Sequence, residues 1–242
     1  MTLLSVEGLE ARHGQLQAVR GVSLVIAPGE TIALVGANGA GKTTMLRTIA
    51  GAHPIAGGRV RFKGRDLAGT AAHQRAAMGL ALVPEGRRLF ARLTVDENLQ
   101  LARSAGRPGA WTLDAVMTAF PNLVQRRKSL AGSLSGGEQQ ATAIGRALMM
   151  NPELLMLDEV SLGLSPLAVD RVYAGLNTLK SSGVAILLVE QDLKRAMAMA
   201  SRTICMLEGQ IAIEGPTDTL TREQVTQAYF GLRGAHGAEA RP

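Results

Sequence analysis

Residues 36–43 read Gly36-Ala37-Asn38-Gly39-Ala40-Gly41-Lys42-Thr43 and fit the pattern G-x-x-x-x-G-K-[ST]. The apolar run before them, Thr31–Val35, is expected to be a buried strand, whereas residues 44–50 have helical spacing. A glycine-rich turn between a strand and a helix offers backbone N–H groups and a helix N-terminus to phosphate. Lys42 would reach the terminal phosphates, and the Thr43 hydroxyl would bind Mg²⁺. The sequence therefore predicts a phosphate-binding loop.

The second half of such a site is an acid at the end of another buried strand. The apolar run at residues 154–157 is followed directly by Asp158 and Glu159. Asp158 is placed to hold the Mg²⁺. Glu159 is suited to orient or deprotonate the attacking water, because positioning and charge neutralisation dominate phosphoryl transfer.

The composition is that of a folded protein, with 242 residues, 46% of them apolar and 19% charged. The net charge of +6 leaves nucleotide, nucleic acid and a membrane surface as candidate partners, but one Trp, two Tyr and four Phe give few stacking platforms for single-stranded nucleic acid. The lone Cys205 and an N-terminus that carries acids favour the cytosol. The apolar run at residues 184–189 is far too short for a membrane helix, so any membrane role is expected to be peripheral.

The rest of the chain reads as an α/β protein. Strand patterns occur at residues 3–9, 19–26 and 59–62, and the parallel-strand runs at 154–157 and 184–189 flank a helical stretch at 166–180. Between about residues 94 and 150 only helical spacings recur, which predicts an inserted helical subdomain.

A third motif, Leu134-Ser135-Gly136-Gly137-Glu138-Gln139-Gln140, has the small-residue turn at the start of a helix that forms a second phosphate site. Together with the phosphate-binding loop it resembles the ATP-binding-cassette (ABC) family. The signature of that family is L-S-G-G-Q, so Glu138 is a departure that leaves the serine and glycines intact. A capping box between Ser135 and Glu138 is compatible with this role.

The resemblance implies an ABC ATPase of the P-loop NTPase fold, with a mixed, largely parallel sheet core, an N-terminal antiparallel β part and an inserted α-helical subdomain. It implies one domain over residues 1–232, in which 1–85 and 151–232 form the nucleotide-binding core and about 86–150 form the helical subdomain. Residues 233–242 have almost nothing to bury and are expected to be a disordered tail.

The resemblance also implies the cofactors, ATP and Mg²⁺, and the residues that hold them. Asp158, Thr43 and Glu85 would contact the metal, and Glu159, Gln191 and Glu85 would serve catalysis. The expected nucleotide contacts are His13, Val19, Gly36, Asn38, Gly39, Ala40, Gly41, Lys42, Thr43 and Thr44, with Ser135, Gly136, Gly137 and Glu138 for the nucleotide of a partner ATPase. In the family two such ATPases pack head to tail, and the segment at residues 161–166 stands where the chains cross.

Three of these residues depart from the general family pattern. His13 stands where the family usually has a Tyr stacked on adenine, and imidazole can still stack over a smaller area. Glu85 replaces a Gln that senses Mg²⁺ and water, and an acid is physically tolerable beside the metal. Gln191 replaces a switch His, and its amide can donate a hydrogen bond but cannot carry a proton. Val160 also replaces the Pro that usually follows the catalytic Glu in the family, and nothing in the sequence explains this substitution.

The same departures resemble one of the two ATPases of branched-chain amino acid importers. This implies a peripheral protein at the cytoplasmic face of the membrane. Its expected partners are a second ATPase subunit, in a heterodimer or a homodimer, two membrane permease subunits and, indirectly, a substrate-binding protein, with no nucleic acid. Residues 87–93 and the helical insert are expected to form the docking cleft for the permease.

Three other readings stay open. Urea or short-amide importers have closely similar motifs. A DNA-repair or chromosome-maintenance ATPase would suit the charge, but those proteins separate the two halves of the site by long coiled coils, and no sustained heptads occur here. A regulatory switch that binds nucleotide without hydrolysing it is motivated by Glu85 and Gln191, and Glu159 speaks against it.

Overall fold

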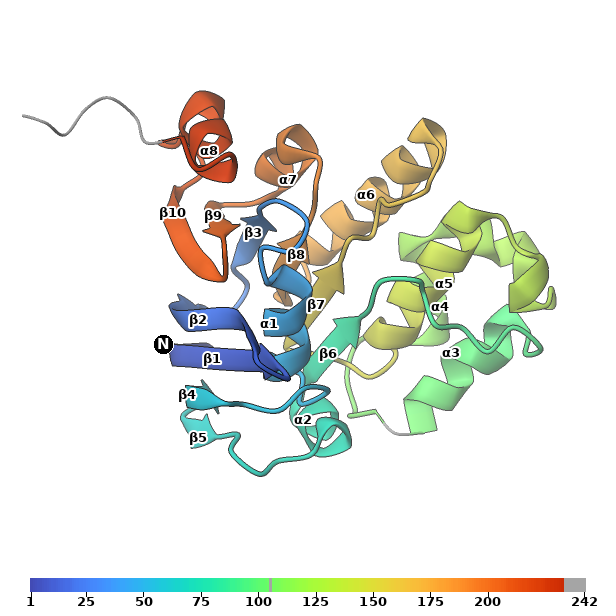
Figure 1. The fold of residues 1–242 in the computed structure, drawn as a ribbon. Coiled ribbons are helices and arrows are strands. Elements are labelled where there is room, and N and C mark those ends of the chain that lie inside the picture. Colours follow the sequence, from blue (N-terminus) through green and yellow to red (C-terminus); the bar gives the residue numbers. More distant parts are fainter. Residues whose placement is uncertain (105, 233–242) are drawn as a thin grey trace, which may run out of the picture.

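The computed structural model describes residues 1–104 and 106–232, which form two sheets with helices around them (Figure 1). The larger sheet has the strand order β10-β9-β3-β8-β7-β6. Its parallel strands are β3 (Thr31–Val35), β6 (Leu80–Val83), β7 (Leu154–Asp158), β8 (Ala185–Val189) and β9 (Arg202–Leu207), and β10 (Gln210–Pro216) runs antiparallel to β9. Every residue of β3, β7 and β8 is buried, which explains their continuous apolar sequences.

The smaller sheet is antiparallel and has the order β2-β1-β4-β5. Its strands are β1 (Leu4–His13), β2 (Leu16–Ile26), β4 (Gly57–Phe62) and β5 (Arg65–Asp66). Helix α1 (Lys42–Ile49) lies between the two sheets and contacts β1, β2 and β7 (Figure 1). Met45, Leu46 and Ile49 of this helix are fully buried. The helix that follows the glycine-rich loop is therefore held rigidly by both sheets.

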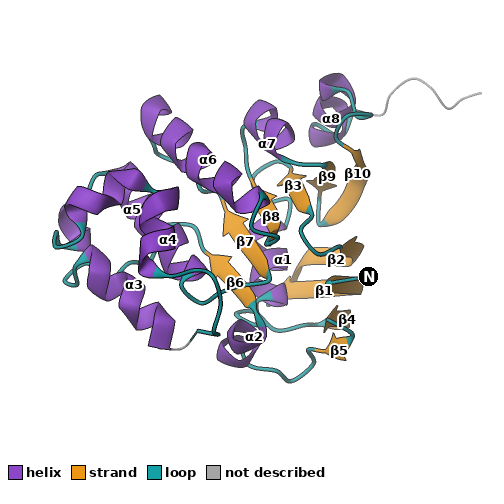
Figure 2. Cartoon of the chain, turned by 180° about the vertical axis from the view of Figure 1, so that it is seen from behind, coloured by secondary structure: helices purple, strands orange, loops and turns teal. Residues whose placement is uncertain are grey.

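The other helices gather mainly at the β6 side and around α6 (Figure 2). They are α2 (Ala72–Met78), α3 (Val95–Ser104), α4 (Leu113–Ala119), α5 (Gly136–Leu148), α6 (Pro166–Lys180), α7 (Leu193–Met199) and α8 (Arg222–Tyr229). Helix α5 packs on α3 and α6, while α7 contacts β3 and α8 contacts β9 and β10. Two 3₁₀ turns, Pro121–Arg126 and Ala131–Ser133, join α4 to α5. None of the helices in residues 1–104 and 106–232 combines the length and the hydropathy of a membrane-spanning segment.

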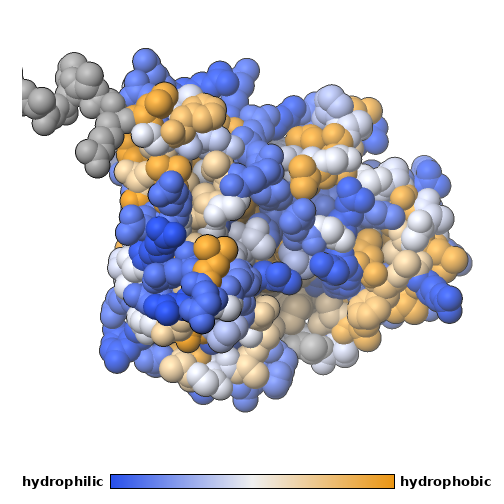
Figure 3. Space-filling view, in the orientation of Figure 1, coloured by the Kyte–Doolittle hydropathy of each residue, from blue (hydrophilic) through white to orange (hydrophobic). Residues whose placement is uncertain are grey.

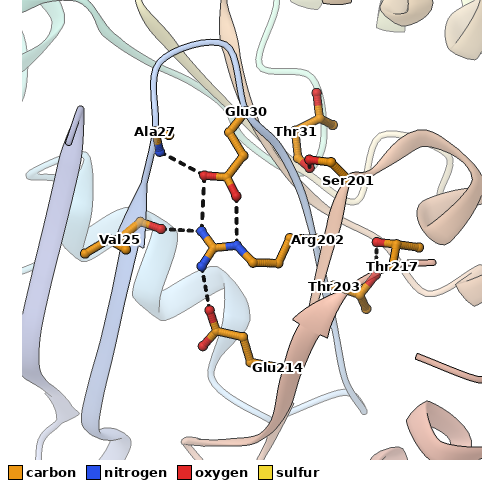
Figure 4. Close-up of polar contacts among 9 residues, drawn as sticks. All are labelled: Val25, Ala27, Glu30, Thr31, Ser201, Arg202, Thr203, Glu214 and Thr217. Atoms are coloured by element: carbon orange, nitrogen blue, oxygen red, sulfur yellow. Dashed lines mark hydrogen bonds and ion pairs between the residues drawn. The ribbon is translucent and has the colours of Figure 1, made fainter. Parts of the chain in front are cut away.

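Arg202, at the start of β9, ties the two sheets together (Figure 4). Its Nε lies 2.8 Å from Glu30 Oε1, and its Nη1 lies 2.6 Å from Glu214 Oε1. Its Nη2 also donates to the carbonyl oxygen of Val25 in β2. Glu30 in turn accepts a hydrogen bond from the backbone N–H of Ala27 at 2.8 Å. One guanidinium thus joins β2, β9, β10 and the turn before β3.

The fold class expected from the sequence is confirmed: the protein is α/β, with a largely parallel sheet, an antiparallel N-terminal sheet and a group of helices between β6 and β7. The expected strand Thr31–Val35 and the helix Pro166–Lys180 have the expected bounds. Helix α5 begins at Gly136, within the motif expected to open a helix, and the expected capping box between Ser135 and Glu138 is present. The domain boundaries near residues 86 and 150 stay a prediction. The tail at 233–242 lies outside the described residues.

Candidate functional site: a phosphate-binding cavity

A cavity of about 500 Å³ opens at the carboxyl ends of β3, β7 and β8, where the loops that follow these strands meet. Ligands bind at this edge in open α/β sheets. The cavity is lined by His13, Leu16, Ala18, Asn38, Gly39, Ala40, Gly41, Lys42, Thr43, Thr44, Glu85, Glu159, Leu162 and Gln191. Most of the residues expected to contact nucleotide are thus brought to one place.

Two glycines let the loop pass close to neighbouring backbone. Gly36 has a φ of 147°, and a Cβ placed there would lie 2.2 Å from the carbonyl oxygen of Met206. Gly41 has a φ of 98°, and its Cβ would lie 2.2 Å from the carbonyl oxygen of Ala18. No side chain fits at either position, so the loop is held against β9 and β2 in a conformation that requires glycine.

Lys42 is buried and folds back over its own loop. Its Nζ donates to the carbonyl oxygens of Gly36 at 2.6 Å and Ala37 at 2.9 Å. Burial lowers the pKa of the ammonium, while Glu159 and Asp158 act to raise it. The cation is therefore positioned beside the glycine-rich turn, with carbonyl partners that phosphate oxygens could replace.

Thr43 and Asp158 face one another from α1 and the end of β7. The Thr43 hydroxyl donates to Asp158 Oδ1 at 3.0 Å, and Asp158 is only 2% exposed. Burial raises the pKa of Asp158, Glu159 and Glu85 add to that rise, and Thr43 and Lys42 oppose it. Glu85, which follows β6 and Pro84, lines the same cavity. These hydroxyl and carboxylate oxygens are the ligand types that suit Mg²⁺.

Glu159 and Gln191 lie across the ends of the adjacent strands β7 and β8. Gln191 Nε2 donates to Glu159 Oε2 at 2.8 Å and to Asn38 Oδ1 at 3.1 Å. The backbone N–H of Glu159 donates to the carbonyl oxygen of Val189 at 3.0 Å, and Glu159 has a φ of 50°. A non-glycine residue in the left-handed region is uncommon and is held there by its surroundings.

His13 lies at the rim formed by β1. Its Nε2 is 3.1 Å from the Thr44 hydroxyl oxygen, and its ring centroid is 4.5 Å from that of His53, at an interplanar angle of 45°. Val19, which was expected at the nucleotide, is fully buried in the core, and Ala18 lines the cavity instead. The pairing of β1 with β2 shifts register at three places, and such a shift decides which side chains reach the cavity face.

The signature residues lie apart from this cavity, at the N-terminus of α5. Ser135 and Glu138 form a reciprocal cap: the backbone N–H of Ser135 donates to Glu138 Oε2 at 2.9 Å, and its hydroxyl donates to the same oxygen at 2.8 Å. Arg126 Nε contacts Glu138 Oε1 at 2.9 Å. Burial would raise the pKa of Glu138, but these bonds outweigh it and lower the pKa. Gly137 has no room for a side chain, because its Cβ would lie 2.7 Å from that of Ala168.

Sequence reasoning missed Leu16, Ala18 and Leu162 as cavity-lining residues. Leu16 and Ala18 lie in β2, and the alternation of apolar and polar residues in this strand does not indicate which of its faces meets a ligand. Leu162 belongs to the segment at residues 161–166 that was expected where the chains cross, and here it is 48% exposed and lines the chain's own cavity.

A glycine-rich turn between a buried strand and a helix, with a buried lysine and a strand-end carboxylate opposite, defines a nucleotide-binding protein of the P-loop class. The ABC transporter family model matches residues 19–161. BraG of Pseudomonas aeruginosa, a high-affinity branched-chain amino acid transport ATP-binding protein, is 40% identical over 95% of this chain and 100% of its own length. The chain therefore belongs to the ABC transporter family, as an ATPase subunit.

Two further relatives agree with this placement. LivF of Archaeoglobus fulgidus, a probable branched-chain amino acid transport ATP-binding protein, is 32% identical over 92% of this chain and 95% of its own length. The crystal structure of a nucleotide-free ATP-binding cassette from an ABC transporter superposes with a TM-score of 0.80 at 26% identity, and covers 95% of this chain and 99% of that one.

Proposed function

We propose that this chain hydrolyses ATP in the cavity at the ends of β3, β7 and β8 and thereby drives import of branched-chain amino acids through separate permease subunits. The observation that carries the hydrolytic part is the meeting of Lys42, Glu159 and Gln191 in one cavity, where Thr43 donates to Asp158. The solute is proposed because BraG and LivF are branched-chain amino acid transport proteins by name.

Each residue has a separate task in this proposal. The backbone N–H groups of the loop wrap the phosphates, and Lys42 exchanges its two carbonyl partners for phosphate oxygens. Glu159 accepts the proton of the attacking water, and Gln191 keeps the carboxylate turned toward the phosphates. Thr43, Asp158 and Glu85 would hold Mg²⁺, which supplies neutralisation of the charge that develops on the phosphates.

Ser135, Gly136, Gly137 and Glu138 are proposed to contact the nucleotide of a second ATPase subunit. They stand at the N-terminus of a 13-residue helix, where the partial positive charge favours phosphate, and they are remote from the chain's own cavity. A head-to-tail pair would bring the signature of one chain to the phosphate-binding loop of the other.

The permease is proposed to dock on a groove of about 330 Å³ lined in part by Pro84, Phe90, Leu101 and Arg146. Phe90 is 51% exposed and Leu101 is 47% exposed, and the Arg146 guanidinium lies 5.6 Å from the centre of the Phe90 ring. Figure 3 shows apolar side chains gathered over this helical part of the molecule. Such a surface suits a partner helix. We further propose that the protein works at the cytoplasmic face of the membrane, with a substrate-binding protein as an indirect partner, and that it does not act on nucleic acid.

The first experiment measures steady-state ATPase activity of the purified chain beside Glu159→Gln, alone and mixed with a second ABC ATPase subunit. Activity that falls with the substitution supports the proposed site. Activity unchanged by Glu159→Gln contradicts the role of this acid. The solute is tested after reconstitution with the permease and binding protein, where leucine, but not urea, should stimulate hydrolysis.

A further inference from the structure

One buried carboxylate beside the cavity has no place in the mechanism above. Glu190 follows β8 directly and is only 1% exposed. Its Oε1 accepts the backbone N–H of Ser161 at 3.1 Å, and its Oε2 accepts the Ser161 hydroxyl at 2.6 Å. Both carboxylate oxygens therefore bind Ser161, on the loop that follows β7, and the Tyr173 hydroxyl and the backbone N–H of Gln191 also interact with this carboxylate.

A carboxylate at such a position is costly unless its oxygens are hydrogen-bonded. Burial raises the pKa of Glu190, and the bonds from Ser161 oppose that rise. An apolar side chain could fill the same volume without this cost. The presence of a carboxylate at this position is therefore better explained by its hydrogen bonds to Ser161 than by packing.

The contact belongs to a set of ties between the two loops. Asp158 and Val189 are register partners, and the N–H of Glu159 donates to the carbonyl oxygen of Val189. Gln191 then reaches back to the Glu159 side chain at 2.8 Å. Glu190 and Gln191, the two residues after β8, are therefore hydrogen-bonded to Ser161 and Glu159, which follow β7. The backbone N–H of Glu190 also donates to Leu34 in β3, at 3.3 Å, so the tie extends to the strand before the phosphate-binding loop.

The backbone of Glu159 explains why such a tie is needed. Its φ of 50° is unfavourable for a residue with a side chain, and such a conformation persists only where neighbouring contacts fix it. Ser161 lies two residues further on and is fixed in both its amide and its hydroxyl. Release of Ser161 would let this turn relax and move the Glu159 carboxylate away from Gln191.

We propose that Glu190 is a positioning residue for hydrolysis, which clamps Ser161 and so holds the Glu159 carboxylate in its place against Gln191. The inference rests on the proposed role of Glu159 in activating water. Glu190 itself does not line the cavity.

Three substitutions separate this role from a general effect on folding. Glu190→Ala removes both acceptors and should lower kcat about tenfold or more, because hydrogen bonds to a charged group are among the stronger ones. Ser161→Ala removes one bond and should have a smaller effect. Glu190→Gln should restore most of the activity, since its amide oxygen can accept from the Ser161 N–H and its NH₂ can donate to the hydroxyl oxygen. KM for ATP should change little in all three.

A matched control is available in α3. Glu97 Oε2 accepts the backbone N–H of Thr94 at 2.7 Å and its hydroxyl at 2.8 Å, which is the same type of contact outside the nucleotide cavity. Glu97→Ala should leave kcat unchanged. Amide hydrogen exchange provides a readout that needs no activity: in Glu190→Ala the peptide covering residues 159–165 should exchange faster, whereas in Glu97→Ala its exchange should stay at the wild-type rate.

The experiment begins with Glu159→Gln in the same ATPase assay. If that substitution leaves hydrolysis unchanged, the proposed function of the acid fails, and exchange at residues 159–165 alone tests the clamp. If Glu159→Gln abolishes hydrolysis while Glu190→Ala keeps wild-type kcat or wild-type exchange, the clamp is overturned. It is also overturned if Glu190→Gln fails to restore activity, or if the loss of kcat is matched by an equal loss of nucleotide affinity.

Discussion

The amide of Gln191 donates a hydrogen bond to the Glu159 carboxylate, with 2.8 Å between Nε2 and Oε2. An amide has no titration near neutral pH, so it orients the carboxylate without changing its own charge. A histidine at this place would gain a proton as the pH falls through about 6.5. Gln191 therefore adds no titratable group to this contact, whereas a histidine would add one.

This leads to a test by Gln191→His. The ratio of its kcat to that of the wild type should change between about pH 6 and about pH 8, because only the variant titrates at this position. The ratio cancels the titration of ATP itself. Gln191→Asn is the control. It shortens the side chain by one methylene but keeps a neutral amide, so the ratio of its kcat to that of the wild type should stay constant with pH. Parallel pH profiles for Gln191→His and the wild type would contradict the importance of this contact.

The two loop glycines should differ in their tolerance of a methyl group. Gly41→Ala places a Cβ against the carbonyl oxygen of Ala18, and overpacking of this kind costs about 1–3 kcal/mol. Gly39 has open space around its Cβ position and is strained only through its φ of 82°. We expect Gly41→Ala to weaken nucleotide binding more than Gly39→Ala does, as measured with a fluorescent ATP analogue. Equal losses would mean that φ, and not the approach to β2, limits the loop.

Asp158 should destabilise the nucleotide-free chain. Burial raises its pKa above the ordinary value near 3.8, so the ionised form disfavours folding at neutral pH. The penalty is relieved as the pH falls through the raised folded-state pKa toward the unfolded value. Asp158→Asn keeps the acceptor for Thr43 and should therefore raise the melting temperature at neutral pH, with a gain that shrinks as the pH is lowered. A lower melting temperature in the variant, measured by calorimetry, would argue against this sign.

Cys205 should react with maleimide only when the chain opens. It is fully buried in β9, where it pairs with Val35 of β3, and burial raises the pKa of its thiol to about 11. The thiolate is the reactive form, so native protein at neutral pH should label very slowly. Mg²⁺ and ATP should slow labelling further by stabilising the folded state. The extent of labelling is measured by mass spectrometry. Rapid labelling of the native chain would show that β9 separates from β3 without global unfolding.

Phe90 should matter for transport and not for nucleotide binding. Phe90→Asp places a charge in the groove proposed for the permease and should uncouple transport while ATP binding is largely preserved. Phe230→Asp is the matched control. Phe230 is 66% exposed, follows α8 and does not line the groove. Uptake of labelled leucine into proteoliposomes gives the readout. Intact uptake with Phe90→Asp would reject this docking site.

The phosphate-binding loop and the acidic pair could be predicted because each is contiguous in sequence. Residues 36–43 carry their glycines, lysine and threonine in one run, and Asp158 stands directly after an apolar strand. The fold class could be predicted because the apolar runs at residues 154–157 and 184–189 flank a helical stretch, as parallel strands do. The nucleotide contact expected at Val19 could not be settled in this way, because bulges in the pairing of β1 and β2 decide whether residue 18 or 19 faces the cavity.

Other parts were beyond sequence reasoning for different reasons. Helices α2 and α7 have seven residues each and β6 has four, which is too short for a clear period. The clamp of Glu190 on Ser161 joins residues far apart in the chain, and only the parallel pairing of β7 with β8 brings them together. The roles assigned to the site residues, including the signature at Ser135, stay predictions.

The position of β3 in the sheet has a consequence for protein synthesis. This strand leaves the ribosome early, yet its two neighbours are β8 and β9, which are made last of all the parallel strands. A nascent chain that ends before residue 185 carries the whole phosphate-binding motif but neither of the strands that support it. Such non-local pairing delays folding until the required residues exist. We therefore expect a truncated chain of that length to bind no ATP, although every residue of the motif is present.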